Sequence, residues 1–282
     1  TTNCPGSSGT MTTKDRLQGR GVFILNAATG AILWRAGPGS ANSTRKQVAQ
    51  INYAMPGDLA VLRNRSNTGA RVDDFGTESV PAGYMDRIYA SDTGGNVWRI
   101  DVADTTGLGT STIPEFAVTR LASIAEAPAS GSHAALNYRK FMFSPDVVYA
   151  TGYDAVLLGS GDREHPFDQV VKNRFYMFKD KNPGTILKTD VNETSSDMTV
   201  RWKAPNAVII TDTSSGTDLF DATSNCLQDA SKCTTGSPAY ASQAAAKTAL
   251  QNAQGWKLRY DPNDGEKTVA TATTAAGTVI FN

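Results

Sequence analysis

The sequence lacks several features that would assign it to a common functional class. Its 27 Lys and Arg residues balance 27 Asp and Glu residues, so the formal net charge is zero and nothing in the overall charge favours nucleic acid as a partner. No apolar run approaches the roughly 18 residues that a membrane-spanning helix needs, so we expect no membrane insertion by this segment. The three Cys and two His residues lack the clustered ligand spacing of a zinc site.

The two ends of the sequence also lack expected features. No signal-peptide pattern opens the chain. Residues 278–281 form an apolar strand pattern, which would leave an unprotected strand edge if they were a natural terminus. We therefore expect a fragment of a longer protein, with any targeting segment lying outside it.

Cysteine is scarce, but two of the three residues lie close together. Cys226 and Cys233 enclose a six-residue polar segment with turn-forming neighbours, which favours a disulfide in an exposed loop. Two free thiols in a reducing compartment are the alternative. Cys4 would then be unpaired, or paired with a residue outside this sequence.

What the sequence does contain is a repeated hairpin. Residues 21–34 and 87–101 each place an apolar run before a turn rich in Thr and Gly, and each carries a Trp on the return strand, Trp34 and Trp98. A repeated hairpin with a fixed Trp is typical of radially repeated blades, so the sequence predicts an all-β fold of the β-propeller type. At these repeated positions we expect both Trp rings to pack between blades and to be largely buried.

One segment departs from the β pattern. Residues 238–254 are rich in Ala, with Ser237 before Pro238 at the start and Gly255 just after the end, the asymmetry that is typical of a helix. The sequence therefore predicts one α-helix inserted between strands of a propeller with long loops. We expect residues 1–18 to be a flexible entry segment and residues 19–282 to form a single domain.

Two strings of residues carry a family resemblance. They are Asp92-Thr-Gly-Gly-Asn-Val-Trp-Arg99 and Gly159-Ser-Gly-Asp-Arg-Glu-His-Pro166, and stretches at 139–148 and 172–180 fit in the same order. Together they resemble the C-terminal β-propeller domain of the PilC/PilY family of type IV pilus biogenesis factors and tip adhesins. The resemblance spans nearly all of 21–281 and implies a modified propeller with quinoprotein-like blades.

The resemblance also implies a function. The family acts at the pilus tip, so the expected partners are minor pilins together with a host or abiotic surface ligand. The expected location is extracellular, at the pilus tip and cell surface, reached through the periplasm and outer membrane. Surface loops at 64–86, 104–115 and 211–240 would carry the partner contacts, and we expect no enzymatic activity and no catalytic residues.

The family often carries a calcium loop in front of its Asp-Arg-hydrophobic-Tyr strand. Here two of the alternate ligand positions hold apolar side chains, so an intact loop of that type is not expected. Two interpretations stay open: a rearranged calcium site formed by Asp73, Asp74, Glu78 and Asp86, or a solvated acidic loop. Calcium is the only cofactor that the sequence suggests.

The loop at 159–168 concentrates charged side chains. An enzyme would use His165 as a general base oriented by a carboxylate. A structural interpretation suits the segment better, because Asp162, Arg163, Glu164 and His165 are close enough in sequence to bond turn amides and to pair across blades. Two other classes also remain, a quinone-cofactor (PQQ-type) dehydrogenase propeller and a periplasmic scaffold for outer-membrane assembly, since such propellers share the hairpin with Trp.

Overall fold

The computed structural model describes most of the chain. It covers residues 19–63, 71–72, 79–80, 85–102, 116–125, 138–181, 209–213, 216–260 and 265–282. β-strands are the main regular structure of these residues and helices are few, which confirms the all-β prediction. Several sheets are present among them and none is closed, so the described residues do not by themselves show a propeller.

Three sheets make up most of the structure. The first sheet has the order β1-β2-β3 and consists of β1 (Val22–Leu25), β2 (Ile32–Gly37) and β3 (Arg45–Gln47). The second sheet has the order β13-β9-β8-β7-β4 and consists of β4 (Ala60–Arg63), β7 (Met85–Ser91), β8 (Asn96–Asp101), β9 (Ala117–Ser123) and β13 (Ile210–Thr211). The third sheet has the order β10-β11-β12-β15-β14 and consists of β10 (Asp146–Ala150), β11 (Tyr153–Gly159), β12 (Arg174–Asp180), β14 (Phe220–Asp221) and β15 (Gly255–Arg259).

Smaller elements complete the described structure. Two strand pairs stand apart from the three sheets: β5 (Arg71–Val72) with β6 (Ser79–Val80), and β16 (Thr273–Ala275) with β17 (Thr278–Ile280). The helices are α1 (Ser231–Thr235) and α2 (Gln243–Asn252). Neither helix is long and apolar enough to cross a membrane, and no other helix occurs among the described residues.

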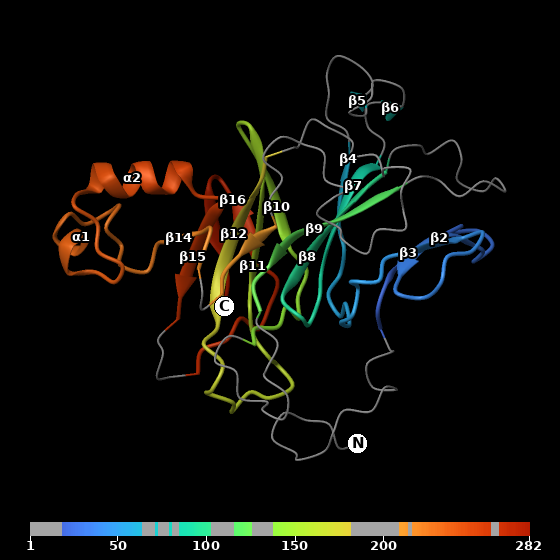
Figure 1. Cartoon of the computed structure of the whole chain (residues 1–282), viewed down its shortest axis with the longest axis horizontal. Coiled ribbons are helices and arrows are strands. Elements are labelled where there is room, and N and C mark those ends of the chain that lie inside the picture. Colours follow the sequence, from blue (N-terminus) through green and yellow to red (C-terminus); the bar gives the residue numbers. More distant parts are fainter. Residues whose placement is uncertain are drawn as a thin grey trace.

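The three sheets stack side by side, with α1 and α2 at one end and the first sheet at the other (Figure 1). The period-2 alternation of strand side chains explains the stacking. On β7, Ile88 faces a core shared with Trp34 of the first sheet, whereas the next residue, Tyr89, faces a core shared with Tyr176 of the third sheet. On β12, Phe175 faces a further core that includes Ala272. The second and third sheets are therefore buried on both faces.

A network of charged residues crosses the interface between the second and third sheets. Arg99 is fully buried, and its guanidinium lies 2.5 Å from Asp101 Oδ1 and 2.7 Å from Asp180 Oδ2. Burial alone would lower the pKa of Arg99, but Asp101 and Asp180 raise it well above its ordinary value, so the side chain stays charged. Tyr89 adds a hydroxyl that donates to Asp180 at 2.6 Å.

A second ion pair of the same interface joins Arg87 of β7 to Asp154 of β11, with the nitrogen and oxygen 2.6 Å apart. These residues come from strands far apart in sequence, so the network fixes how one sheet lies against the other.

The turn between β7 and β8 is held together by hydrogen bonds to the side chain of Asp92. Asp92 is fully buried, and its carboxylate accepts hydrogen bonds from the backbone amides of Gly94 and Asn96 and from Trp98 Nε1 at 2.8 Å. Gly95 has a φ of +72°, a conformation that glycine adopts without strain. The Asp-Thr-Gly-Gly-Asn-Val-Trp string is thus one hydrogen-bonded unit that anchors the Trp ring.

The first hairpin reproduces this unit only in part. Asn26 Oδ1 accepts from the amides of Ala28 and Thr29, and Gly30 again has a φ of +72°. Trp34 is fully buried like Trp98. Its Nε1, however, is buried without a hydrogen-bond partner among the described residues, so the two hairpins share packing rather than hydrogen bonding.

The predicted helix at 238–254 is wrong at its start. The helix α2 begins at Gln243, because Ser242 has an extended backbone and its hydroxyl accepts a hydrogen bond from the Ala245 amide. The preceding residues are held in another conformation, since the Tyr240 ring stacks on Phe220 at 5.1 Å between centroids. The short helix α1 was not predicted. It contains Cys233, which forms a disulfide with Cys226.

We predict that Arg99→Met lowers the free energy of unfolding by about 3–5 kcal/mol, because it leaves two buried carboxylates without their cation. Urea unfolding followed by tryptophan fluorescence measures the loss. Arg163→Met is the matched control, since Arg163 is exposed and its removal should change stability by less than about 0.5 kcal/mol. Equal stability of Arg99→Met and the unaltered protein would contradict the assigned role of the network.

Candidate functional site

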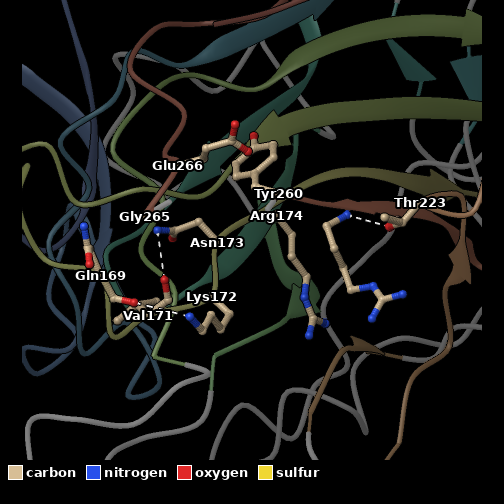
Figure 2. A pocket seen from close by; sticks show the side chains of 10 residues that line it. Gln169, Val171, Lys172, Asn173, Arg174, Thr223, Tyr260, Gly265 and Glu266 are labelled. Atoms are coloured by element: carbon tan, nitrogen blue, oxygen red, sulfur yellow. Dashed lines mark hydrogen bonds between the residues drawn. The ribbon is translucent and has the colours of Figure 1, made fainter. Parts of the chain in front are cut away.

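A pocket of about 330 Å³ lies at one end of the third sheet, where β12 begins and β15 ends. Four separate segments of the chain supply its walls. The lining residues are Gln169, Val171, Lys172, Asn173, Arg174, Thr223, Arg259, Tyr260, Gly265 and Glu266. Figure 2 shows Lys172 and Arg174 with their charged ends toward one side of the pocket, and Tyr260 and Glu266 on another side.

Two arginines face each other across the strands at this pocket. Arg174 and Arg259 are direct partners in the antiparallel register of β12 and β15. Like charges at such positions are unfavourable unless other groups compensate them. Arg174 forms an ion pair with Asp212, and Arg259 Nε lies 2.9 Å from Asp221 Oδ2. The two carboxylates thus make the arrangement possible.

Asp212 is the centre of the compensating network. It is buried and lies 2.6 Å from Lys257 Nζ as well as contacting Arg174, and it accepts a hydrogen bond from Tyr176 at 3.0 Å. Arg139 approaches it at 3.8 Å. Burial alone would raise the pKa of Asp212, but Arg174 and the hydrogen bond from Lys257 outweigh burial and hold the pKa below its ordinary value. Asp212 is therefore ionised at neutral pH.

The side of the pocket that contains Tyr260 also carries the Glu266 carboxylate (Figure 2). Burial is the main cause that raises the pKa of Tyr260 to about 12, so its hydroxyl keeps its proton at neutral pH and pairs with Thr268. Across the pocket, Thr223 Oγ1 accepts a hydrogen bond from the Arg259 amide at 2.8 Å. The pocket therefore combines a cationic side with a side that holds an aromatic ring and one carboxylate.

The loop at 159–168 lies next to this pocket and is held by a small polar network. Asp162 accepts hydrogen bonds from Lys140 Nζ and from the Glu164 amide, and its Oδ2 lies 2.9 Å from His165 Nδ1. Burial alone would raise the pKa of Asp162, but the hydrogen bond and charge of Lys140 hold it below its ordinary value. These contacts tie the loop to Lys140 and close the turn.

Glycine allows another segment to approach this loop closely. A Cβ at Gly161 would lie 2.6 Å from the carbonyl oxygen of Thr268, which is too close for any other residue. Ser160 between the glycines accepts a hydrogen bond from the Thr268 amide at 3.1 Å through its carbonyl. The Gly-Ser-Gly part of the string thus joins the third sheet to the C-terminal segment.

Asp162, Glu164 and His165 could also hold a metal ion, because their ligand atoms lie within 4.8 Å of one another. The Lys140 ammonium already contacts the same Asp162 oxygen that faces His165. A cation at that oxygen would have to displace it. The Arg163 side chain is exposed. It takes part in none of the described contacts that hold this loop.

The described structure does not test the predicted calcium site, because Asp73, Asp74 and Glu78 lie outside the described residues. Asp86 is the second residue of β7, is buried, and has one carboxylate oxygen 3.5 Å from Arg87 Nε.

The pocket residues were missed in the sequence, although a weak signal exists. Lys257 and Arg259 are cations within an otherwise apolar and aromatic strand pattern, 255–259. A charge in such a strand needs a buried partner. The partner Asp212 lies 45 positions away, and no local spacing indicates that distance.

No protein-family model matches the chain, and no curated protein matches it. Among solved structures the chain is similar to the crystal structure of the Pseudomonas aeruginosa PilY1 C-terminal domain, with a TM-score of 0.47 and 13% sequence identity. The similarity covers 93% of this chain and 49% of that one, so the chain spans about half the length of that structure.

We predict that Asp212→Asn lowers the free energy of unfolding by about 3–5 kcal/mol at pH 7, because Arg174 and Lys257 then lose their shared counter-ion. Since the folded pKa of Asp212 is lowered, its contribution is complete above the unfolded value of about 4 and is lost as the pH falls below it. Urea unfolding at pH 7 and at pH 3 should therefore show a difference that shrinks in acid.

Asp58→Asn serves as the matched control for this experiment, because Asp58 is exposed. It should leave stability within about 0.5 kcal/mol of the unaltered protein at both pH values. A loss for Asp212→Asn that stays constant down to pH 3 would contradict the assigned ionisation.

Proposed function

We propose that this chain is a non-enzymatic binding module of a type IV pilus protein, and that its stacked sheets belong to a modified β-propeller. The support for the family is the resemblance of residues 92–99 and 159–166 to the PilC/PilY strings. Both strings have a structural task in the fold: the first anchors Trp98 through Asp92, and the second joins the third sheet to Thr268.

One observation carries the non-enzymatic part of the proposal. In two networks of the described residues, charged side chains are engaged with one another: Arg99 with Asp101 and Asp180, and Asp162 with Lys140 and His165. A general base needs a free path to a reacting group, whereas these contacts hold strands and turns in place. The arrangement therefore suits a rigid frame that presents loops and a pocket to a partner.

The proposed partners are the minor pilins at the pilus tip together with a surface ligand. The proposed location is the pilus tip and cell surface, reached through the periplasm and outer membrane. The Cys226–Cys233 disulfide is in keeping with an oxidising compartment.

We predict that the purified chain binds at least one purified minor pilin from the same genome with a Kd in the micromolar range or tighter, as expected for a specific protein interface. Biolayer interferometry with each minor pilin immobilised in turn measures the association. The major pilin and an unrelated disulfide-containing domain are the controls. Lack of binding to every minor pilin, with binding to outer-membrane assembly factors, would refute the pilus role.

A further inference from the structure

We propose that the pocket between the ends of β12 and β15 binds a carboxylate of an acidic peptide segment. The inference rests on the proposed binding function, because such a segment would belong to the partner protein. It concerns a site that the family resemblance does not assign.

The charges around the pocket are the first reason. Five cations lie at the pocket or in its ion-pair network, against the three carboxylates of Asp212, Asp221 and Glu266. The cations are Arg139, Lys172, Arg174, Lys257 and Arg259. Asp212 bears one negative charge while contacting both Arg174 and Lys257, so it cannot neutralise both. Positive charge therefore remains in excess at the end of the third sheet.

The burial of these groups strengthens their attraction for an anion. Lys257 is largely buried, and desolvation lowers its pKa despite the hydrogen bond from its ammonium to Asp212. A further negative charge near Arg174 and Arg259 would lessen the electrostatic cost of holding these cations together. The electrostatic potential of these cations thus favours a ligand carboxylate.

The geometry of the donors suits a carboxylate. An arginine guanidinium is a planar fork that matches the two oxygens of a carboxylate. Arg174 and Arg259 bring two such groups to the pocket from adjacent strands. Arg174 uses Nη1 for Asp212, and Arg259 uses Nε for Asp221 and Nη2 for the Ser237 carbonyl, so a ligand would meet the other nitrogens of each group. The Thr223 hydroxyl accepts from the Arg259 amide and can donate its own proton to a ligand.

The size and surroundings of the pocket favour a peptide. A volume of about 330 Å³ lies at the lower end of the range for ligand pockets and admits one acidic residue with part of its neighbours. The loop that supplies Gln169 and Val171 also presents Phe167, which is 94% exposed, and Val170, which is 42% exposed. An aromatic or aliphatic residue beside the acidic one could pack on these side chains.

The test uses two fluorescein-labelled octapeptides that differ only in charge, one with Phe beside two Glu residues and one with Gln in place of both Glu residues. Fluorescence anisotropy on the whole purified chain should show binding of the acidic peptide about tenfold or more tighter than that of the amide peptide. Equal binding of the two peptides would overturn the proposal.

Variants then locate the binding site. Arg259→Gln should weaken the acidic peptide about tenfold and leave the amide peptide unaffected, whereas Arg163→Gln, which removes an exposed arginine outside the pocket lining, should change neither. Thermal melting confirms that each variant is folded. An equal loss in both variants would mean general surface attraction and would overturn the pocket assignment.

A measurement on the unaltered chain covers the case in which Arg259→Gln does not fold. In ¹H–¹⁵N spectra, the acidic peptide should shift the amides of Thr223, Arg259 and Tyr260, whereas shifts confined to other regions would refute the site. Acetate should compete with the acidic peptide whereas the same concentration of neutral acetamide should not, and equal competition by both would overturn the ligand class. Retained pilin binding with no peptide binding rejects the pocket alone, whereas loss of both rejects the proposed function too.

Discussion

The arrangement of the two central sheets depends on the buried charges between them. The hydrophobic effect is non-directional, so apolar side chains alone would permit the second and third sheets to stack at several offsets. Arg99 can contact both Asp101 on its own strand and Asp180 on the other sheet at one offset only. We interpret the network as selecting the alignment, because the cost of taking such charges out of water offsets much of their attraction.

The same principle operates at the pocket, with a different result. Asp212 gathers Arg174 and Lys257 from two adjacent strands of the third sheet and thereby fixes the end of that sheet. There the cations outnumber the carboxylates and part of the group reaches solvent. The same kind of ion-pair network that holds strands together in the interior therefore leaves, at the surface, an excess of positive charge that favours an anion.

Local patterns in the sequence predicted the local parts of the fold. The hairpins around Trp34 and Trp98 follow from apolar alternation and turn glycines, signals that lie within about fifteen residues. The start of α2 could not be found in this way, because Ser237 and Ser242 are both suitable N-cap residues and the choice is made by the packing of Tyr240 on Phe220.

The candidate site could not be predicted for a related reason. Arg174 and Arg259 become neighbours only when β12 pairs with β15, and the segment between them contains both helices. A pairing of this kind has no local signature. The strings at 92–99 and 159–166, in contrast, form hydrogen bonds mainly among residues close in sequence. Their specific composition could therefore be recognised in the sequence.

The layered cores have a consequence for how the molecule loses its structure. Each sheet is buried against its immediate neighbours, and the apolar cores lie between successive layers. Among the described residues the first sheet packs against a neighbour on one face, and on the other face Phe23 and Leu25 remain about half exposed. Opening is therefore easiest at this outer layer, whereas the central sheets can separate only after a layer beside them has been removed. The order of the layers is in this sense an order of local stability.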